Sequence, residues 1–324
     1  MRRIMSDSPT PPTGTGTAPA GGTPAGHARR RRPRPRHAVP AAIVVAAALG
    51  AGQLMTGSSG AQADPGAEVA ADVVRVAEFV AECTFSHRLP DDPIVFPDLP
   101  GASHMHSFFG NTSVDAHTTV EDLLRGESNC DPVVDLSGYW VPTLYVDGEP
   151  VEPATATFYY LGEGVNENVT AAIQPMPLGL KMLAGNAVAT SPDEASSRWS
   201  CLHAGHVEPS RDFVECPPDT MLESYLDFPQ CWDGVNLDSA DHKSHMSYPV
   251  AGQCPESHPV PVPKLRQVLR YPVNGDPSRF ELASGPGYTM HGDLFNAWPE
   301  DEMERRVRDC INPVIKCGPD GRPS

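Results

Sequence analysis

The chain lacks the short motifs that identify several common enzyme classes. It has no G-x-S-x-G nucleophile elbow, no Gly-rich phosphate-binding loop and no C-x-x-C pair. These absences argue against a serine hydrolase, a nucleotide-binding enzyme, a zinc ribbon and a thioredoxin-like protein. Paired carboxylates for glycoside hydrolysis cannot be selected from so many acidic residues without geometry.

Basic residues are scarce after residue 63. That part of the chain carries 16 Lys and Arg residues against 40 Asp and Glu residues, a net charge of −24. A surface this acidic repels phosphate backbones, so we expect no nucleic-acid partner. The composition suits solubility, a divalent cation or a neutral ligand such as a glycan.

The first 63 residues differ in character from the rest. Residues 1–37 are rich in Pro, Thr, Gly and Ala, end in the basic run RRRRPRPRH, and are expected to be disordered. Residues 38–63 are uncharged and Ala/Val-rich and end in Ala-Gln-Ala, which predicts the core of a signal peptide. The alternative is an uncleaved membrane anchor over residues 38–55. We therefore expect a secreted or extracellular protein, or one anchored to the membrane with its domain outside.

All eight cysteines lie in the part expected to be exported. An even number in an oxidising compartment predicts four disulfides. We expect sequential pairing because it closes short loops: Cys83–Cys130, Cys201–Cys216, Cys231–Cys254 and Cys310–Cys317.

Proline and turn residues predict the fold class. Residues 64–324 contain 28 prolines, too many for long helices or a parallel α/β sheet. The runs DPIVFPDLPG, YWVPTLYVDGEPV and TATFYYLGEG predict short strands, and Asp147-Gly148 predicts a tight hairpin. We expect a mainly β, loop-rich, disulfide-stapled, β-sandwich-like single domain over residues 83–317, with a few short helices.

Two segments have helix-like patterns. Residues 64–82 are expected to form a linker or a short helix, although their valines also permit a strand. Near the end of the chain, Pro299 suits a first helical turn and the acidic residues 300–302 suit its positive end. Met303, Val307 and Ile311 then share one face, which predicts a helix.

Histidines and aspartates form three groups that are candidates for a functional site. His104 and His106 stand at i and i+2, so on a strand both side chains point to one face. His291 and Asp293 repeat this spacing around a glycine. The third group is DHKSH (241–245), whose side chains share a face if the segment is a helical turn.

We expect these groups to converge on one pocket. The five imidazoles are then candidate ligands of a divalent metal such as zinc, copper or manganese: His104, His106, His242, His245 and His291. Asp241 and Asp293 are candidate catalytic residues, either orienting a ligand or acting as a base. A metal-free acid–base site and a purely structural role for the histidines are the alternatives.

The order of the motifs resembles a known family. DPIVFPDLPGASHMHSFFGN is followed by a cysteine before DLSGYWVPTLY, then by FPQCWDGVNLDSADHKSHMSYP, CPESHPVPVPKL and SGPGYTMHGDLFNAW. This series resembles an uncharacterised secreted-protein domain, a domain of unknown function, found in actinomycetes and in filamentous fungi, there often beside WSC carbohydrate-binding modules. The resemblance covers about Cys83 to Cys310 and implies an extracellular or wall-associated protein with no established catalytic activity. This chain departs from the family in having no WSC module.

Two functions follow from these observations. The first is an exported domain whose His/Asp pocket binds a divalent metal and acts on an extracellular polymer such as a polysaccharide of the cell wall. The alternative is a non-catalytic glycan or cell-surface binding module, in which aromatic rings stack on sugar: Trp140, Trp232 and Trp298.

Overall fold

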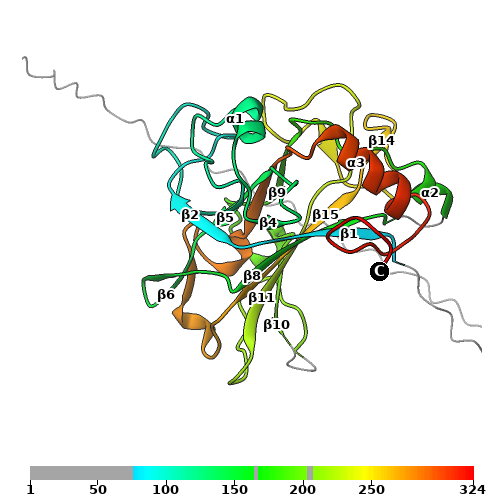
Figure 1. Cartoon of the computed structure of the whole chain (residues 1–324). Helices are drawn as coiled ribbons and strands as arrows, with labels where there is room; N and C mark the ends of the chain where they lie inside the picture. Colours follow the sequence, from blue (N-terminus) through cyan, green and yellow to red (C-terminus); the bar gives the residue numbers. More distant parts are fainter. Residues whose placement is uncertain (1–75, 164–166, 203–206) are drawn as a thin grey trace, which may run out of the picture. The chain divides into compact units, whose positions relative to one another are not determined.

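The longest strands are buried at most of their residues, and the partly exposed side chains lie on one face. In β8 (Thr155–Leu161), Phe158 and Tyr160 are buried whereas Tyr159 between them is partly exposed. Five further strands extend this into a six-stranded antiparallel sheet of order β10-β11-β15-β8-β1-β4 (Figure 1). They are β1 (Glu78–Cys83), β4 (Cys130–Asp131), β10 (Arg198–Leu202), β11 (Met221–Asp227) and β15 (Lys264–Tyr271).

A second, five-stranded antiparallel sheet packs against the first. Its order is β2-β3-β5-β17-β9. Between the sheets, the ring of Tyr139 stacks on that of Phe158 with 3.7 Å between centroids. The sandwich-like arrangement expected from the sequence is therefore confirmed. The strands are β2 (Phe85–Leu89), β3 (His106–Gly110), β5 (Gly138–Pro142), β9 (Lys181–Gly185) and β17 (His291–Phe295).

The five-stranded sheet is also covered on its outer face, so that β3 and β5 are buried at every residue. There Phe108 and Trp140 pack with Ile94, Val114 and Leu123 in a second apolar cluster. The covering residues come from the loops after β2 and β3 and from α1 (Val120–Arg125). A capping box begins α1, with Thr119 Oγ1 accepting from the Asp122 backbone N–H.

The computed structural model describes residues 76–163, 167–202 and 207–324. The expected basic region 1–37, the signal core or anchor 38–63 and residues 64–75 lie outside the described residues. All described residues belong to one compact unit, Glu68–Ser324. Within them, none of the helices has the length and apolar character needed to cross a membrane.

Shorter elements complete the domain. Two three-stranded sheets have the orders β16-β6-β7 and β13-β12-β14. Helix α3 (Glu300–Arg306) continues into η4 (Val307–Ile311), and the helix predicted at this place is confirmed. The strands are β6 (Leu144–Val146), β7 (Glu149–Val151), β12 (Cys231–Trp232), β13 (Met246–Ser247), β14 (Val260–Pro261) and β16 (Phe280–Leu282); α2 (Glu167–Ala171) and the short turns η1 (Pro192–Glu194), η2 (Pro277–Arg279) and η3 (Gly287–Thr289) lie between them.

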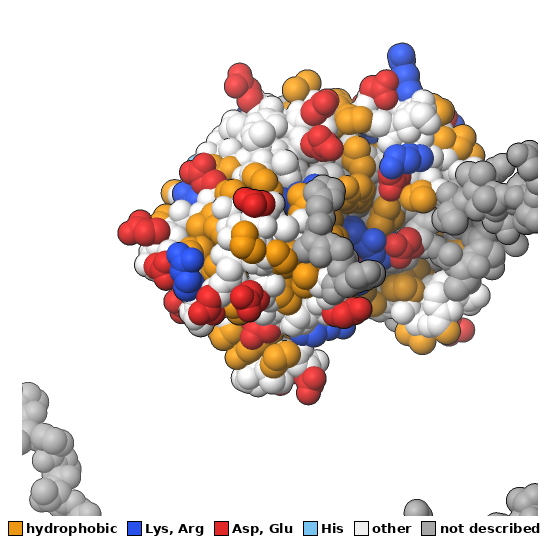
Figure 2. All heavy atoms as spheres, turned by 90° about the horizontal axis from the view of Figure 1, so that it is seen from below, with side chains coloured by type: hydrophobic (Ala, Val, Ile, Leu, Met, Phe, Trp, Pro, Cys, Tyr) orange, Lys and Arg blue, Asp and Glu red, His pale blue; other side chains and the backbone are white. Residues whose placement is uncertain are grey.

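Several local predictions can be compared with the structure. The hairpin is confirmed: Asp147 and Gly148 both have positive φ, 52° and 84°, and join β6 to β7. All four disulfides pair as predicted. On the face shown in Figure 2, acidic side chains lie at several separate places rather than in one patch.

One alternative is decided and one local prediction is wrong. Of the helix and the strand left open before residue 83, the structure has the strand, because Glu78–Cys83 pairs along its length with β8, and the folded domain therefore includes residues before 83. The segment DPIVFPDLPG forms turns instead of a strand. Its backbone N–H groups donate to two buried carboxylates, those of Asp91 and Asp92, and not to a neighbouring strand.

A chain of buried polar groups crosses the sandwich. Tyr139 Oη donates to Asp135 Oδ2 at 2.6 Å, so the hydroxyl of Tyr160, also at 2.6 Å, must donate to Tyr139 Oη. Trp298 Nε1 in turn donates to Tyr160 Oη at 3.0 Å, and the Arg306 guanidinium lies over the Trp298 ring. Burial raises the pKa of Asp135 to about 6 against the opposing effect of its hydrogen bonds.

This pKa predicts a pH-dependent stability. Because the folded-state pKa lies above the unfolded value of 3.8, the stabilisation is complete below pH 3.8 and is lost as pH rises through about 6. In Asp135→Asn that loss disappears, so the variant should gain up to about 3 kcal/mol relative to wild type over this range. Urea unfolding at several pH values measures the difference. The exposed variant Glu127→Gln is the control, and parallel curves for Asp135→Asn and wild type would contradict the prediction.

Candidate metal centre

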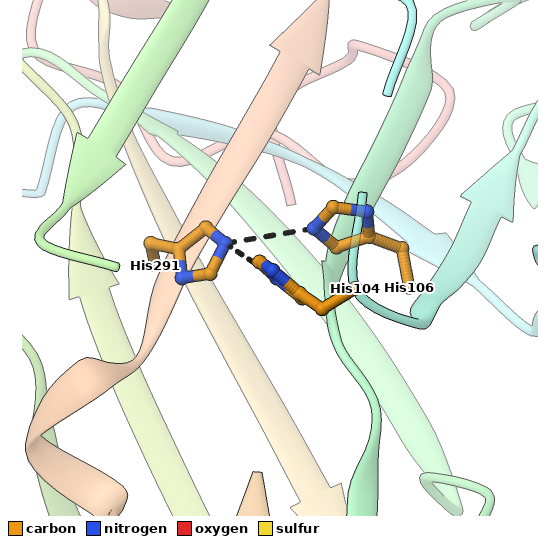
Figure 3. Close-up of side chains that lie close together, drawn as sticks. All are labelled: His104, His106 and His291. Atoms are coloured by element: carbon orange, nitrogen blue, oxygen red, sulfur yellow. Dashed lines mark hydrogen bonds between the residues drawn. The ribbon is translucent and has the colours of Figure 1, made fainter. Parts of the chain in front are cut away.

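Three imidazoles meet at one end of the five-stranded sheet. His106 begins β3 and His291 begins β17, and these strands lie on either side of β5. His106 pairs with Pro142, the last residue of β5. His104 lies two residues before the start of β3. Figure 3 shows the three rings pointing their nitrogens toward a common point.

The hydrogen bonds of two of these rings orient their free nitrogens. His106 Nδ1 lies 2.9 Å from the carbonyl oxygen of Asp91, and His291 Nδ1 lies 2.9 Å from that of Thr289. Since a carbonyl only accepts, both Nδ1 atoms carry the proton and both Nε2 atoms present a lone pair. A backbone carbonyl behind a histidine is the usual support of a metal-ligating imidazole.

The three Nε2 atoms have the separation expected of ligands that share an ion. His291 Nε2 lies 3.1 Å from His104 Nε2 and 3.5 Å from His106 Nε2. Ligands ~2.0–2.1 Å from a tetrahedral ion are about 3.3 Å from one another. The lone pairs of His106 and His291 cannot bond to each other, so only the contact between His104 and His291 can be a hydrogen bond, and a cation would satisfy the lone pair of His106.

Two buried carboxyl groups lie next to the imidazoles. Asp293 stands two residues after His291 on β17 and faces the same side. Ligand atoms of Asp92, Asp293 and His106 all lie within 4.8 Å of one another. Asp92 Oδ1 accepts from the backbone N–H groups of Ile94 and Val95, whereas Asp293 Oδ2 has no hydrogen-bond partner among the described residues.

Burial dominates the electrostatics of the site. It raises the pKa of Asp293 well above its usual value, with the nearby charge of Asp92 adding to the effect. Burial also raises the pKa of Asp92. It lowers the pKa of His104, lowers that of His106 well below its usual value and lowers that of His291 to about 4. The imidazoles are therefore neutral near pH 7, the form that binds metal.

The site opens into a cavity of about 470 Å³. His104, His291 and both carboxyl-bearing residues, Asp92 and Asp293, contribute to its wall, and Lys243 lines it from the loop before β13. The other lining side chains are mainly apolar. A small molecule or a chain end could therefore reach the imidazoles directly.

Two glycines allow the strands to approach closely here. Gly185 pairs with His291 at φ 88°, and a Cβ on it would lie 2.4 Å from the Met290 carbonyl oxygen. Gly292 points to the inner face, where a Cβ would lie 3.0 Å from Leu226 of the six-stranded sheet. The glycine between His291 and Asp293 thus brings the two sheets together and leaves both polar side chains on the outer face.

The DHKSH segment does not supply ligands to this cluster. It forms a turn, not a helix, and the imidazole of His245 is engaged at both nitrogens, with Ser239 Oγ and the Lys181 carbonyl. His242 pairs with Asp238 at 2.9 Å and reaches the site only through its electrostatic effect on Asp92. Asp241 is exposed, and its carboxylate accepts from the backbone N–H groups of the same turn.

The three tryptophans proposed as sugar-stacking residues do not form a platform. Trp140 and Trp298 are 0% and 1% exposed, so neither presents a ring face to a ligand. Trp140 instead pairs with Asp293 across the sheet and packs in the apolar cluster on its outer face. Trp232 is partly buried, and its Nε1 donates to the Asn236 carbonyl.

Asp92 is the site residue that the sequence analysis missed. It stands in the segment taken for a strand, 12 residues before His104. The only signal was the pair Asp91-Asp92 before a short apolar run, a pattern equally typical of an ordinary turn. A second cluster, Cys83, Cys130 and Asp135, also has ligand-like spacing, but its sulfurs are joined in a disulfide.

The unpaired carboxyl of Asp293 should reduce the stability of the metal-free protein. Asp293→Asn removes one of two neighbouring buried acids, so without metal the variant should be more stable by on the order of 1 kcal/mol at pH 7. Unfolding in the presence of chelator measures this. Lower stability of the variant would show that the carboxylate is already satisfied by the protein itself.

The comparisons with known proteins give a family and no function. No curated protein and no solved structure matches the chain. The model of one protein family matches residues 92–298, within the stretch identified from the motif series and containing Asp92, all three histidines and Asp293. The match spans well over half of the chain, which therefore belongs to the family described as Domain of unknown function (DUF1996).

Proposed function

We propose that this protein binds one divalent transition-metal ion through the Nε2 atoms of His104, His106 and His291. The observation that carries the proposal is the meeting of three nitrogens, two of them with lone pairs directed by hydrogen bonds behind the ring. Three neutral imidazoles form a ligand set that suits zinc and leaves a fourth position for water.

The adjacent carboxyls supply the remaining chemistry. A bound cation would favour ionisation of Asp92 and Asp293, whose charged forms burial now penalises. A metal held by the three imidazoles would lower the pKa of a bound water, and Asp92 or Asp293, once ionised, would be close enough to accept a proton from it. The site thus combines the parts needed for metal-assisted hydrolysis.

We infer that the substrate is an extracellular polymer, such as a polysaccharide. Four disulfides support an exported protein because they persist in oxidising compartments. The net negative charge of residues 64–324 argues against polyanions as substrates. The cavity beside the histidines is open to solvent and admits part of a polymer chain.

Metal binding is tested on protein stripped with chelator and titrated with zinc, copper or manganese. One ion per chain is expected, with a rise in melting temperature as bound metal stabilises the folded state. His104→Ala, His106→Ala and His291→Ala should each weaken affinity by about 100-fold or more. His117→Ala, which removes an exposed imidazole paired with Asp98, is the matched control. Absence of stoichiometric metal in wild type would refute the proposal.

Hydrolysis is tested separately from binding. Metal-loaded protein incubated with polysaccharides should release reducing ends, and chelator should abolish the release. Asp92→Asn and Asp293→Asn should retain the metal but lose activity by about 100-fold or more, the range typical of a general base. Full activity in both variants would exclude a carboxylate base, while leaving the metal site itself intact.

A further inference from the structure

A groove of about 940 Å³ lies on the outer face of the six-stranded sheet, away from the layer that carries the histidines. Its lining includes Tyr159 on β8, Arg266 on β15, Tyr225 on β11 and Tyr248 from the loop after β13. None of the lining residues of the histidine cavity contributes to it. The groove is therefore a separate feature, and the inference drawn from it does not depend on the proposed metal.

The strand register places aromatic and charged side chains in rows across this face. Tyr159 pairs with Arg266, which pairs with Asp227 on the next strand. The adjacent row runs from Val268 through Tyr225 to Arg198. These side chains face outward because their neighbours along each strand, such as Leu226, point into the core between the sheets.

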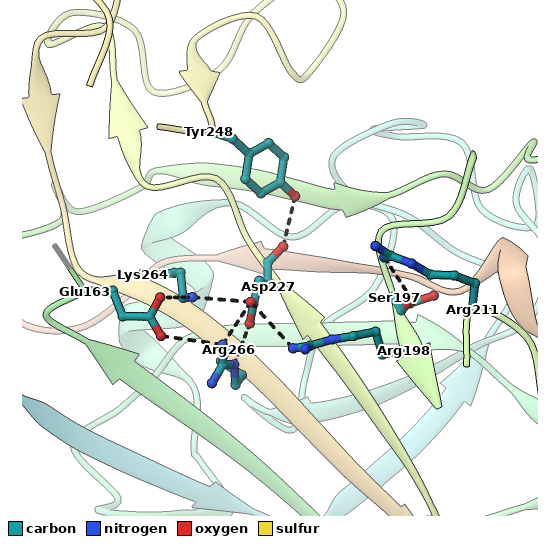
Figure 4. Close-up of polar contacts among 8 residues, drawn as sticks. All are labelled: Glu163, Ser197, Arg198, Arg211, Asp227, Tyr248, Lys264 and Arg266. Atoms are coloured by element: carbon teal, nitrogen blue, oxygen red, sulfur yellow. Dashed lines mark hydrogen bonds and ion pairs between the residues drawn. The ribbon is translucent and has the colours of Figure 1, made fainter. Parts of the chain in front are cut away.

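The cations of the groove are matched by carboxylates. Arg266 donates to both oxygens of Asp227, at 2.6 and 3.0 Å, and Lys264 bonds to Asp227 and to Glu163 (Figure 4). Arg270 Nε donates to Glu223 at 2.7 Å. Lys264 and Glu223 have side chains only 8% and 4% exposed, so part of this network is built into the sheet and is held rigidly.

Three tyrosines flank this network. Tyr159 and Tyr225 are partly exposed on the sheet, and Tyr248 is 46% exposed at the edge of the groove. The Tyr248 hydroxyl donates to the backbone carbonyl of Asp227, and the Arg198 guanidinium lies 5.9 Å from the centre of the Tyr225 ring. The rings are therefore held in place beside the paired charges.

This combination restricts the class of ligand. A polyanion would have to displace carboxylates that already neutralise Arg266 and Lys264, and a cation would meet the same guanidinium groups. A purely apolar ligand would desolvate the charged floor without replacing its hydrogen bonds. A neutral polyhydroxylated ligand can both donate to the carboxylates and accept from the arginines, while tyrosine rings contact its apolar C–H faces.

We propose that the groove binds a neutral oligosaccharide, with Tyr225 and Tyr159 against the sugar rings and the Arg266–Asp227 pair hydrogen-bonding to hydroxyls. Several sugar units fit along a groove of this volume. The same chain would then carry a glycan-binding face and, on another layer of the fold, the histidine cluster. The groove needs no metal for this binding.

The test is titration of the purified full chain with laminarihexaose, cellohexaose, maltohexaose and mannohexaose, each with chelator present throughout. At least one should bind with a dissociation constant between about 1 μM and about 1 mM. Tyr225→Ala and Arg266→Gln should each weaken that binding by roughly tenfold or more. Tyr145→Ala, a partly buried tyrosine on the separate small sheet, should leave it unchanged.

Circular dichroism and melting temperature establish that each variant folds. If Tyr225→Ala does not fold, Tyr248→Ala at the edge of the groove takes its place, with the same weakening expected. The proposal is overturned if none of the four neutral hexasaccharides binds, or if binding is indifferent to all groove variants. It is also overturned if only an anionic probe, polygalacturonate, binds in a salt-sensitive way. Since chelator is present, none of these outcomes depends on the metal proposal.

Discussion

The burial of the five-stranded sheet on both faces is the constraint on which the rest of the structure depends. Its inner face packs on the six-stranded sheet through contacts such as Tyr139 on Phe158. Its outer face is covered by the apolar cluster around Trp140 and Phe108. A sheet in this position excludes water from polar side chains on either side, and each such group must then find a partner or change its protonation state.

Two polar features of the interior follow from that constraint. On the inner side, Asp135 is satisfied by a chain of hydroxyl and indole donors, and its pKa rises. On the outer side, His106 and Asp293 lie at the edge of the covered face, next to a cavity. The Asp135 carboxyl has its hydrogen-bond partners within the protein, whereas Asp293 Oδ2 has none among the described residues and lies near His106. Such incomplete satisfaction is a mark of functional sites rather than of structural networks.

The charged groups of the groove on the six-stranded sheet are paired with one another, unlike the polar groups of the histidine cluster. There Arg266 and Asp227 are paired, so the surface is close to neutral despite its many charges. At the histidine cluster a ligand would have to bring charge, while in the groove it has only to exchange hydrogen bonds with water. The two proposals therefore call for different ligands, a metal ion at the histidine cluster and a neutral molecule in the groove.

Local features were predictable where local chemistry determines them. Asp147-Gly148 forms its hairpin because only a few residue types accept positive φ. Each of the four disulfides joins two consecutive cysteines of the sequence. The prediction of a strand over DPIVFPDLPG was wrong because the backbone N–H groups of this segment donate to buried carboxylates. The composition of the segment gives no sign of this arrangement. The valine spacing before residue 82 was ambiguous, and pairing with β8 decided it.

The sequence by itself favoured the mainly β class and disulfides between consecutive cysteines, and it contains the i, i+2 spacings that place His104 near His106 and His291 near Asp293. Only the tertiary structure decided which groups meet. His106 and His291 are 185 residues apart and converge because β3 and β17 flank β5. His245 was an equal candidate in the sequence, yet its ring is used to hold its own turn to β9. The reason is physical: spacing along a strand sets the face of a side chain, but only strand order and register set its neighbours.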